Sequence, residues 1–167
     1  MNNSEIAYFA GGCFWCITPT FKEIPGVARV VAGYSGGDEI APTYNEVKSQ
    51  MTEHRETMKI EYDPEKVSFE ELFDVFLCGV DPFDGEGQFI DRGHSYTLAV
   101  YFTNKEQERV SKDKINILEE TSGKRVCISV EPFKAFYDAE EEHQDFYLKN
   151  PERFEKELIE SGRISKE

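Results

Sequence analysis

The sequence has no long apolar run and few basic residues, and each shortage argues against a class of protein. No apolar segment approaches the roughly 18 residues that a membrane-spanning helix requires, so a transmembrane protein is not expected. Lysine and arginine together number 19 against 33 aspartates and glutamates, which gives a net charge of −14. Nucleic acids and anionic membranes are bound through Lys and Arg, so neither is an expected partner.

Cysteine and histidine are also scarce, with four and three residues. Cys78 and Cys127 are isolated in the sequence, and the histidines form no paired ligand motif, so a zinc site is not expected. No dinucleotide-type Gly-x-Gly-x-x-Gly is present, and no metal, flavin or nicotinamide cofactor is predicted. The N-terminal residues lack the basic and apolar regions of a secretory signal. We therefore expect a cytoplasmic protein with reduced thiols.

What is present suits one globular domain. The chain has 167 residues, of which 39% are hydrophobic and 13% aromatic, enough for a core. β-Branched and aromatic runs between turn residues predict strands at 6–10, 27–34, 57–62, 97–102 and 126–130. Capping boxes at Ser68-Phe69-Glu70-Glu71 and at Thr103-Asn104-Lys105-Glu106 predict two helices, the second ending near Gly123.

Three further helices are predicted at 14–23, at 140–148 and from 151 to 162. Pro19 is expected to shorten or kink the first of them. Because strands and helices are mixed without regular alternation, we predict an α+β fold, a mixed β-sheet covered by helices. The predicted organisation is one catalytic domain over 1–167, with a core at about 6–150 and a helical C-terminal tail at about 151–167.

The junction Gly11-Gly12-Cys13-Phe14-Trp15-Cys16 follows the first predicted strand and is the most informative segment. Glycines permit positive φ, and a helix N-terminus stabilises a thiolate. The turn is therefore predicted to expose and activate Cys13 as a nucleophile. Phe14 and Trp15 can wall a small apolar pocket beside it. A structural zinc half-site, a redox-active Cys-x-x-Cys pair and an inert buried Cys13 are the alternatives to this interpretation.

Two glycine-rich and aromatic loops, at 33–46 and 81–96, lack a regular pattern, and such loops often carry function. A carboxyl group in an apolar pocket, such as that of Glu56, can donate a proton at neutral pH. The hydroxyls of Tyr44 and Tyr96 can bind an oxygen that gains negative charge. By residue type alone, these residues and Asp91 could equally be surface, core or turn residues. The three histidines are expected to be structural or exposed rather than catalytic: His54, His94 and His143.

Several ordered segments resemble the methionine sulfoxide reductase A family, of peptide-methionine (S)-S-oxide reductases. Gly12-Cys13-Phe14-Trp15-Cys16 is similar to the signature of that family, in its Gly-Cys-Phe-Trp-Cys form. The resemblance spans about residues 6 to 150. Its other segments are Gly33-Tyr34-Ser35-Gly36-Gly37, Pro42-Thr43-Tyr44-Asn45-Glu46-Val47, His54-Arg55-Glu56, Tyr62-Asp63-Pro64, Asp81-Pro82, Gly87-Gln88-Phe89 and Asp91-Arg92-Gly93-His94-Ser95-Tyr96.

The resemblance implies thiol-dependent reduction of the S epimer of methionine sulfoxide, free or in oxidised proteins, as antioxidant repair. It implies a nucleophilic Cys13 that becomes a sulfenic acid, and an acid at Glu56. Matching positions give the other roles: Tyr44 and Tyr96 bind the sulfoxide oxygen, Phe14 and Trp15 hold the methyl group, and Asp91 supports the substrate backbone. A two-layer α/β sandwich is the implied fold.

The regeneration route is where this chain departs from the family. Thr97 stands where an arginine is common, Val80 where a histidine often precedes Asp81, and the C-terminal cysteines of many relatives are missing. Cys16 is the possible resolving thiol, with an external thiol as the alternative, and the reductant could be thioredoxin, glutaredoxin or another thiol. A general thiol–disulfide oxidoreductase using Cys13 and Cys16, or a non-catalytic module that binds methionine-containing peptides, are the other candidate functions.

Overall fold

A six-stranded mixed sheet forms the centre of the protein, in the order β7-β6-β1-β3-β2-β8. The computed structural model describes residues 4–160. Neighbouring strands are antiparallel except β6 and β7, which are parallel. The strands are β1 (Glu5–Gly11), β2 (Val27–Ser35), β3 (Arg55–Tyr62), β6 (Leu98–Phe102), β7 (Ile128–Pro132) and β8 (Phe136–Asp138). A separate hairpin joins β4 (Gly87–Gln88) to β5 (Asp91–Arg92).

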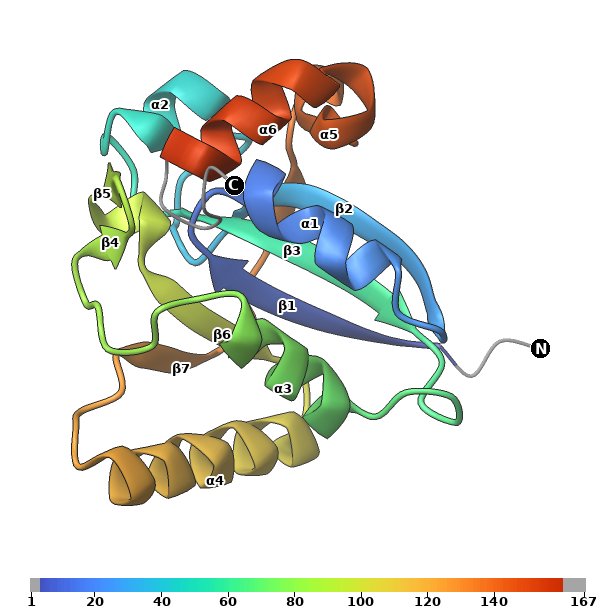
Figure 1. Ribbon diagram of the computed structural model, residues 1–167, viewed down its shortest axis with the longest axis vertical. Coiled ribbons are helices and arrows are strands. Elements are labelled where there is room, and N and C mark those ends of the chain that lie inside the picture. The colour runs from blue at the N-terminus through green and yellow to red at the C-terminus, as the bar shows by residue number, and fades with distance from the viewer. Residues whose placement is uncertain (1–3, 161–167) are drawn as a thin grey trace.

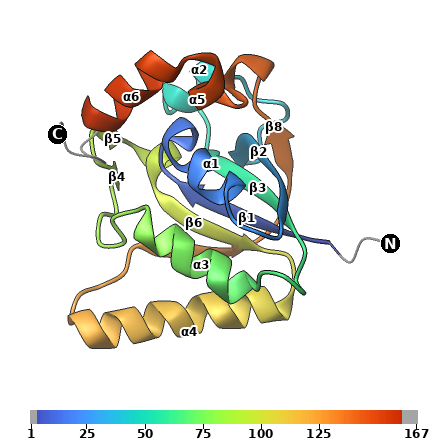
Figure 2. The ribbon, with the colours of Figure 1, turned by 45° about the vertical axis from the view of Figure 1, so that its right-hand side comes forward.

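Helices cover the sheet, as Figure 1 shows. They are α1 (Phe14–Lys22), α2 (Tyr44–Lys48), α3 (Phe69–Cys78), α4 (Lys105–Ser122), α5 (Phe146–Lys149) and α6 (Pro151–Glu160). In the turned view of Figure 2, α6 lies above α1 on the side away from α3 and α4. The predicted α+β fold, a mixed sheet covered by helices, is therefore confirmed.

The two faces of β1 pack against different partners because successive side chains of a strand point to opposite sides. Phe9 faces α1 and α3, and its ring centroid lies 4.9 Å from that of Phe76 and 5.6 Å from that of Phe69. Tyr8 points to the other face, where it stacks on Phe133 at 4.2 Å. Both faces of the central strand are thus anchored by aromatic rings, which fixes where its C-terminal end, and Cys13 after it, must lie.

One predicted helix is wrong. The segment 140–148 contains a 3-10 turn at Glu141–His143 and only the short helix α5. The break lies at Asp145, whose φ of 53° is left-handed. Beside it, the Gln144 side chain accepts a hydrogen bond from Ala32 N at 2.9 Å and donates one to Ala32 O at 2.8 Å. This tertiary contact with β2 holds the chain in a non-helical path.

Three smaller expectations also need correction. The second predicted capping box does not form: the N-cap of α4 is Asn104, one residue later, whose side chain accepts from Gln107 N, while Gln107 Oε1 accepts from Thr103 N. Pro19 does not shorten α1, which continues through it to Lys22. The loops predicted at 33–46 and 81–96 contain regular elements, namely the start of α2 and the β4–β5 hairpin. The predicted end of the last helix, at residue 162, lies outside the described residues.

Candidate active site

Cys13 lies at the N-cap of α1, directly after β1. The preceding Gly12 has a φ of +86°, a conformation that glycine adopts without strain. Gly11 allows close packing, since a Cβ there would lie 2.7 Å from Ile17 Cδ1. The glycine turn at the mouth of a helix is thus where the sequence predicted it.

The electrostatic setting of Cys13 differs from the expected one. Its thiol is buried, with 7% of the residue exposed. A hydrogen bond with Cys16, burial and the nearby carboxylates of Glu56 and Asp91 raise the pKa of Cys13 well above its usual value. The raised pKa keeps Cys13 a thiol at neutral pH rather than the thiolate that the helix N-terminus suggested, so its attack must be coupled to proton transfer.

Glu56 lies beside Cys13, on the neighbouring strand end. It is the second residue of β3, opposite Tyr34 of β2, and is buried. Glu56 Oε1 accepts a hydrogen bond from Phe14 N at 3.2 Å. Oε2 is buried and accepts no hydrogen bond of ordinary geometry from the described residues. Burial raises the pKa of Glu56 to about 8, so the carboxyl group is mostly protonated at neutral pH.

Two tyrosine hydroxyls complete the polar side of the site. Tyr44 opens α2, and Tyr96 ends a 3-10 turn just before β6. Burial, followed by the charge of Glu56, raises the pKa of both tyrosines, so both stay protonated. A protonated hydroxyl can donate to an oxygen that gains negative charge. The structure thus brings both predicted tyrosines to Glu56.

Stacked aromatic rings form the apolar side. Trp15 lies parallel to Phe146 at 4.0 Å between centroids, and Phe14 stacks with Tyr44 at 6.2 Å. Trp15 Nε1 donates to His143 Nδ1 at 3.1 Å, and the His143 ring stacks on Tyr44 at 4.1 Å. Burial lowers the pKa of His143, which keeps its ring neutral and able to accept from the indole.

His143 and Glu140 are site residues that the sequence reasoning missed. Glu140 accepts from Tyr44 N at 2.9 Å and from the Tyr34 hydroxyl at 2.8 Å. Glu140 lies 96 positions after Tyr44 in the sequence, and no local pattern indicates that these segments meet. The other two histidines bond to backbone groups: the buried His54 to Gly37 N and Glu39 O, and the exposed His94 to Glu53 O.

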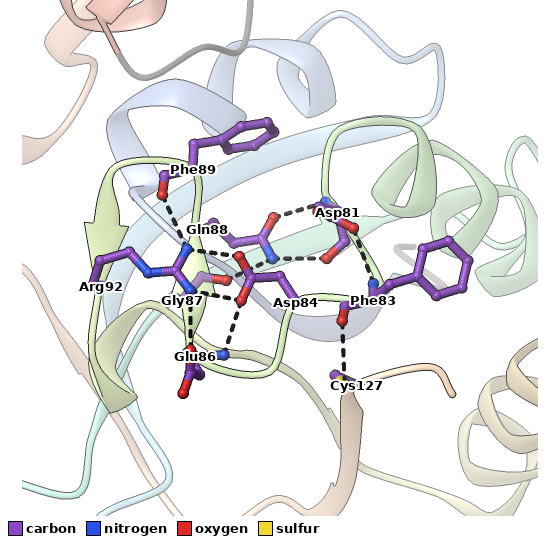
Figure 3. Close-up of polar contacts among 9 residues, drawn as sticks. All are labelled: Asp81, Phe83, Asp84, Glu86, Gly87, Gln88, Phe89, Arg92 and Cys127. Atoms are coloured by element: carbon purple, nitrogen blue, oxygen red, sulfur yellow. Dashed lines mark hydrogen bonds and ion pairs between the residues drawn. The ribbon is translucent and has the colours of Figure 1, made fainter. Parts of the chain in front are cut away.

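Asp91 reaches the site from the β4–β5 hairpin. Its charge raises the pKa of Cys13, Tyr44, Glu56 and Tyr96, which places it near all four. Figure 3 shows how the loop before the hairpin is closed. Arg92 donates to both carboxylate oxygens of Asp84, at 2.6 and 2.8 Å, and Gln88 bonds to Asp81 N and O.

The four cysteines are all thiols in the structure. Cys16 lies one helical turn after Cys13, in contact with it, and is 8% exposed. Cys78 ends α3, and Cys127 lies just before β7. Among residues 4–160, no group of three or more His, Cys, Asp or Glu side chains is placed to hold a metal ion. No helix in the same part of the chain has both the length and the apolar character needed to cross a bilayer.

Known proteins resemble this chain in sequence and in fold. The family described as "Peptide methionine sulfoxide reductase" matches residues 5–166. Peptide methionine sulfoxide reductase MsrA of Bacillus velezensis is 45% identical over 161 residues, covering 95% of this chain and 91% of the relative. Methionine sulfoxide reductase A of Corynebacterium diphtheriae superposes with a TM-score of 0.82 at 30% identity, covering 90% of this chain and 77% of the other. Reduced Mxr1 of Saccharomyces cerevisiae also gives 0.82, at 26% identity, covering 89% and 87%.

Proposed function

Because the chain belongs to the peptide methionine sulfoxide reductase family, we propose that Cys13 is its nucleophile and Glu56 its acid. Enzymes of this family reduce methionine sulfoxide with thiols. The observation that carries this assignment is a buried Glu56 whose pKa is raised to about 8. Its Oε2 accepts no ordinary hydrogen bond from the described residues. A buried, protonated carboxyl group with one oxygen available suits proton donation to a bound substrate.

The neighbouring side chains support one orientation of the substrate. Phe14 and Trp15 hold the methyl group of the sulfoxide. Tyr44 and Tyr96 donate to its oxygen, and Asp91 supports the backbone around it. A methyl group fixed on one side and an oxygen fixed on the other leave sulfur facing Cys13 for one configuration only. The favoured configuration is the S epimer, the one implied by the family resemblance.

The reductive step conserves atoms, electrons and protons. Glu56 gives its proton to the sulfoxide oxygen, and the Cys13 sulfur attacks the substrate sulfur as its own proton passes to the Glu56 carboxylate. The bond from the substrate sulfur to its oxygen and the bond from that sulfur to Cys13 Sγ then break, as a new bond forms between Cys13 Sγ and the oxygen. Methionine leaves, reduced by two electrons, and Cys13 becomes a sulfenic acid, oxidised by two. Glu56 ends the cycle protonated, as it began.

Recycling begins with Cys16. Its thiol contacts Cys13, so its attack on the sulfenic acid releases water and forms a Cys13–Cys16 disulfide. A thioredoxin-type dithiol, glutaredoxin or another thiol then reduces this bond. Mxr1 has also been solved in complex with Trx2. We further propose that the protein acts in the cytoplasm, as one catalytic domain that repairs oxidised methionine.

The test uses an equal mixture of the two sulfur epimers of a methionine sulfoxide peptide, with dithiothreitol as reductant and chiral chromatography as readout. We expect the wild type to consume half of the substrate, all of it the S epimer, and Cys13→Ser to consume none. Cys127→Ser serves as the control for a cysteine away from the site and should behave as the wild type. Consumption of both epimers, or methionine formation by Cys13→Ser, would contradict the assigned pocket.

A further inference from the structure

The proposed disulfide is poorly accessible to a protein reductant. Cys13 and Cys16 are only 7% and 8% exposed. Thiol–disulfide exchange requires the attacking sulfur to reach the disulfide directly. Moreover, Phe154 and Leu158 of α6 pack against the cluster that contains both cysteines. Transfer of the disulfide to a more exposed cysteine would remove this obstacle.

A cavity lined by both α1 and α3 offers that route. It has a volume of about 350 Å³, and both Cys16 of α1 and Cys78 of α3 line it. The helices touch at this place, since a Cβ on Gly79 would lie 3.5 Å from Ile17 Cδ1. Unlike Cys16, Cys78 is exposed. The rest of the wall is mostly apolar: Ile17, Pro19, Val80, Phe89, Phe154 and Leu158.

We propose that Cys78 is a second resolving thiol, which attacks the Cys13–Cys16 disulfide at Cys16. The resulting Cys16–Cys78 disulfide is the one that the reductant reaches. The Cys78 thiolate attacks Cys16 Sγ, the Cys13–Cys16 bond breaks, and Cys13 leaves as a thiolate that takes up the proton lost by Cys78. No external oxidant is needed, because one disulfide replaces another. The proposal rests on the proposed roles of Cys13 and Cys16.

The geometry of the two helices suits this exchange. Cys78 is the last residue of α3, so only a helix end has to close on α1 to reach disulfide geometry. The exchange also returns Cys13 to its thiol form while the oxidised pair sits beside the exposed end of α3. Cys13 could then react with the next substrate before the reductant arrives.

Cys127 is the matched control. It lines a different cavity together with Arg55 and His94. Its thiol donates to Phe83 O at 3.6 Å, and its N–H donates to Pro82 O. Figure 3 shows Cys127 below the loop that leads to the β4–β5 hairpin. A serine there removes a cysteine without touching the cavity of Cys16 and Cys78.

The experiment counts the methionine released per enzyme from excess methionine sulfoxide in the absence of reductant. In the wild type, the first turnover is followed by exchange to Cys16–Cys78, and the regenerated Cys13 reacts once more. We therefore expect two methionines per enzyme for the wild type and for Cys127→Ser, and one for Cys78→Ser. Peptide mapping by mass spectrometry, after alkylation of the remaining thiols, should find a Cys16–Cys78 disulfide in the wild type.

Other outcomes separate this proposal from the one on which it rests. One methionine per wild-type enzyme with a Cys13–Cys16 disulfide overturns the relay and leaves the proposed resolution intact. One methionine with a dimedone adduct on Cys13 and an alkylated Cys16 overturns both. A Cys13–Cys78 disulfide would mean that Cys78 resolves the sulfenic acid directly, which also contradicts the relay.

Discussion

At the scale of single residues, the charge of Glu56 influences the proton of Cys13. Each lies in a buried site, and a negative charge on either raises the pKa of the groups around it. Since burial raises the pKa of Glu56 to about 8, the acid that protonates the sulfoxide is present at neutral pH and is lost as pH rises through that value.

Replacing Glu56 by glutamine keeps the size and the hydrogen-bonding capacity of the side chain but removes its transferable proton. We expect Glu56→Gln to slow the single-turnover release of methionine by about 10²–10⁴ at neutral pH, the usual effect of removing a positioned acid. Wild-type rates should fall as pH rises through about 8, whereas the slower variant should lack this fall. A variant with the wild-type rate and pH profile would reassign the acid.

The same substitution should also change how the stability of the protein depends on pH. The folded-state pKa of about 8 lies above the ordinary 4.5, so the folded protein keeps a proton that the unfolded chain releases within this window. The contribution of Glu56 to the free energy of unfolding of the wild type therefore decreases as pH rises from about 4.5 to about 8. Glutamine does not titrate. The difference in Tm between Glu56→Gln and the wild type should grow in favour of the variant over that range, and thermal unfolding at several pH values measures it.

How much of the site could be predicted depends on how local each signal is. Cys13 was found because its glycine turn, helix start and aromatic neighbours lie within six residues. The raised pKa of that thiol could not be predicted, because burial and the charges of Glu56 and Asp91, on other elements, add to the effect of the Cys16 contact. Likewise, His143 meets Trp15 across 128 positions of sequence, and a lone histidine carries no sign of such a contact.

At the scale of elements, the β4–β5 hairpin positions Asp91 through its backbone. Gly87 has a φ of +150°, and a Cβ there would lie 2.2 Å from Asp91 O. We expect Gly87→Ala to push β5 away from β4 and to reduce kcat/KM by about 10-fold or more, through the misplacement of Asp91. Steady-state kinetics with a methionine sulfoxide peptide measures the loss.

Gly123→Ala is the matched control for this substitution. Gly123 also has a positive φ, +71°, but nothing lies within 4 Å of a Cβ built there. It follows α4, away from the hairpin, so its replacement should cost about 1 kcal/mol of stability and leave kcat/KM unchanged. Equal losses of kcat/KM in both variants would show that the effect comes from general destabilisation rather than from Asp91.

The elements that were predicted correctly are those whose structure depends on residues close together in the sequence. The capping box at Ser68 sets the start of α3 as expected, because Ser68 and Glu71 bond to each other's backbone. The segment 140–148 was misread because its path depends on Gln144 bonding to β2, 112 positions earlier. Strand β8 was missed for a similar reason, since three residues become a strand only by pairing with β2.

At the scale of the whole molecule, the net charge of −14 acts on approaching substrates. Such a field attracts cationic chains and repels anionic ones, and dissolved salt screens it. Two cations lie near the apolar side of the site, with Lys48 Nζ 5.7 Å from the Tyr44 ring and Arg153 Cζ 5.4 Å from the Trp15 ring. The long-range field and these local charges therefore favour substrates of opposite sign.

Two methionine sulfoxide peptides that differ only in flanking Lys or Glu residues separate these effects. We expect the lysine peptide to have the higher kcat/KM by about 3- to 10-fold at low salt, because the net charge governs the encounter. The ratio should approach one as ionic strength rises, while the single-turnover rate at saturation stays the same for both peptides, since the sulfoxide chemistry is identical. A preference for the glutamate peptide at low salt would show instead that Lys48 and Arg153 outweigh the field of the whole protein.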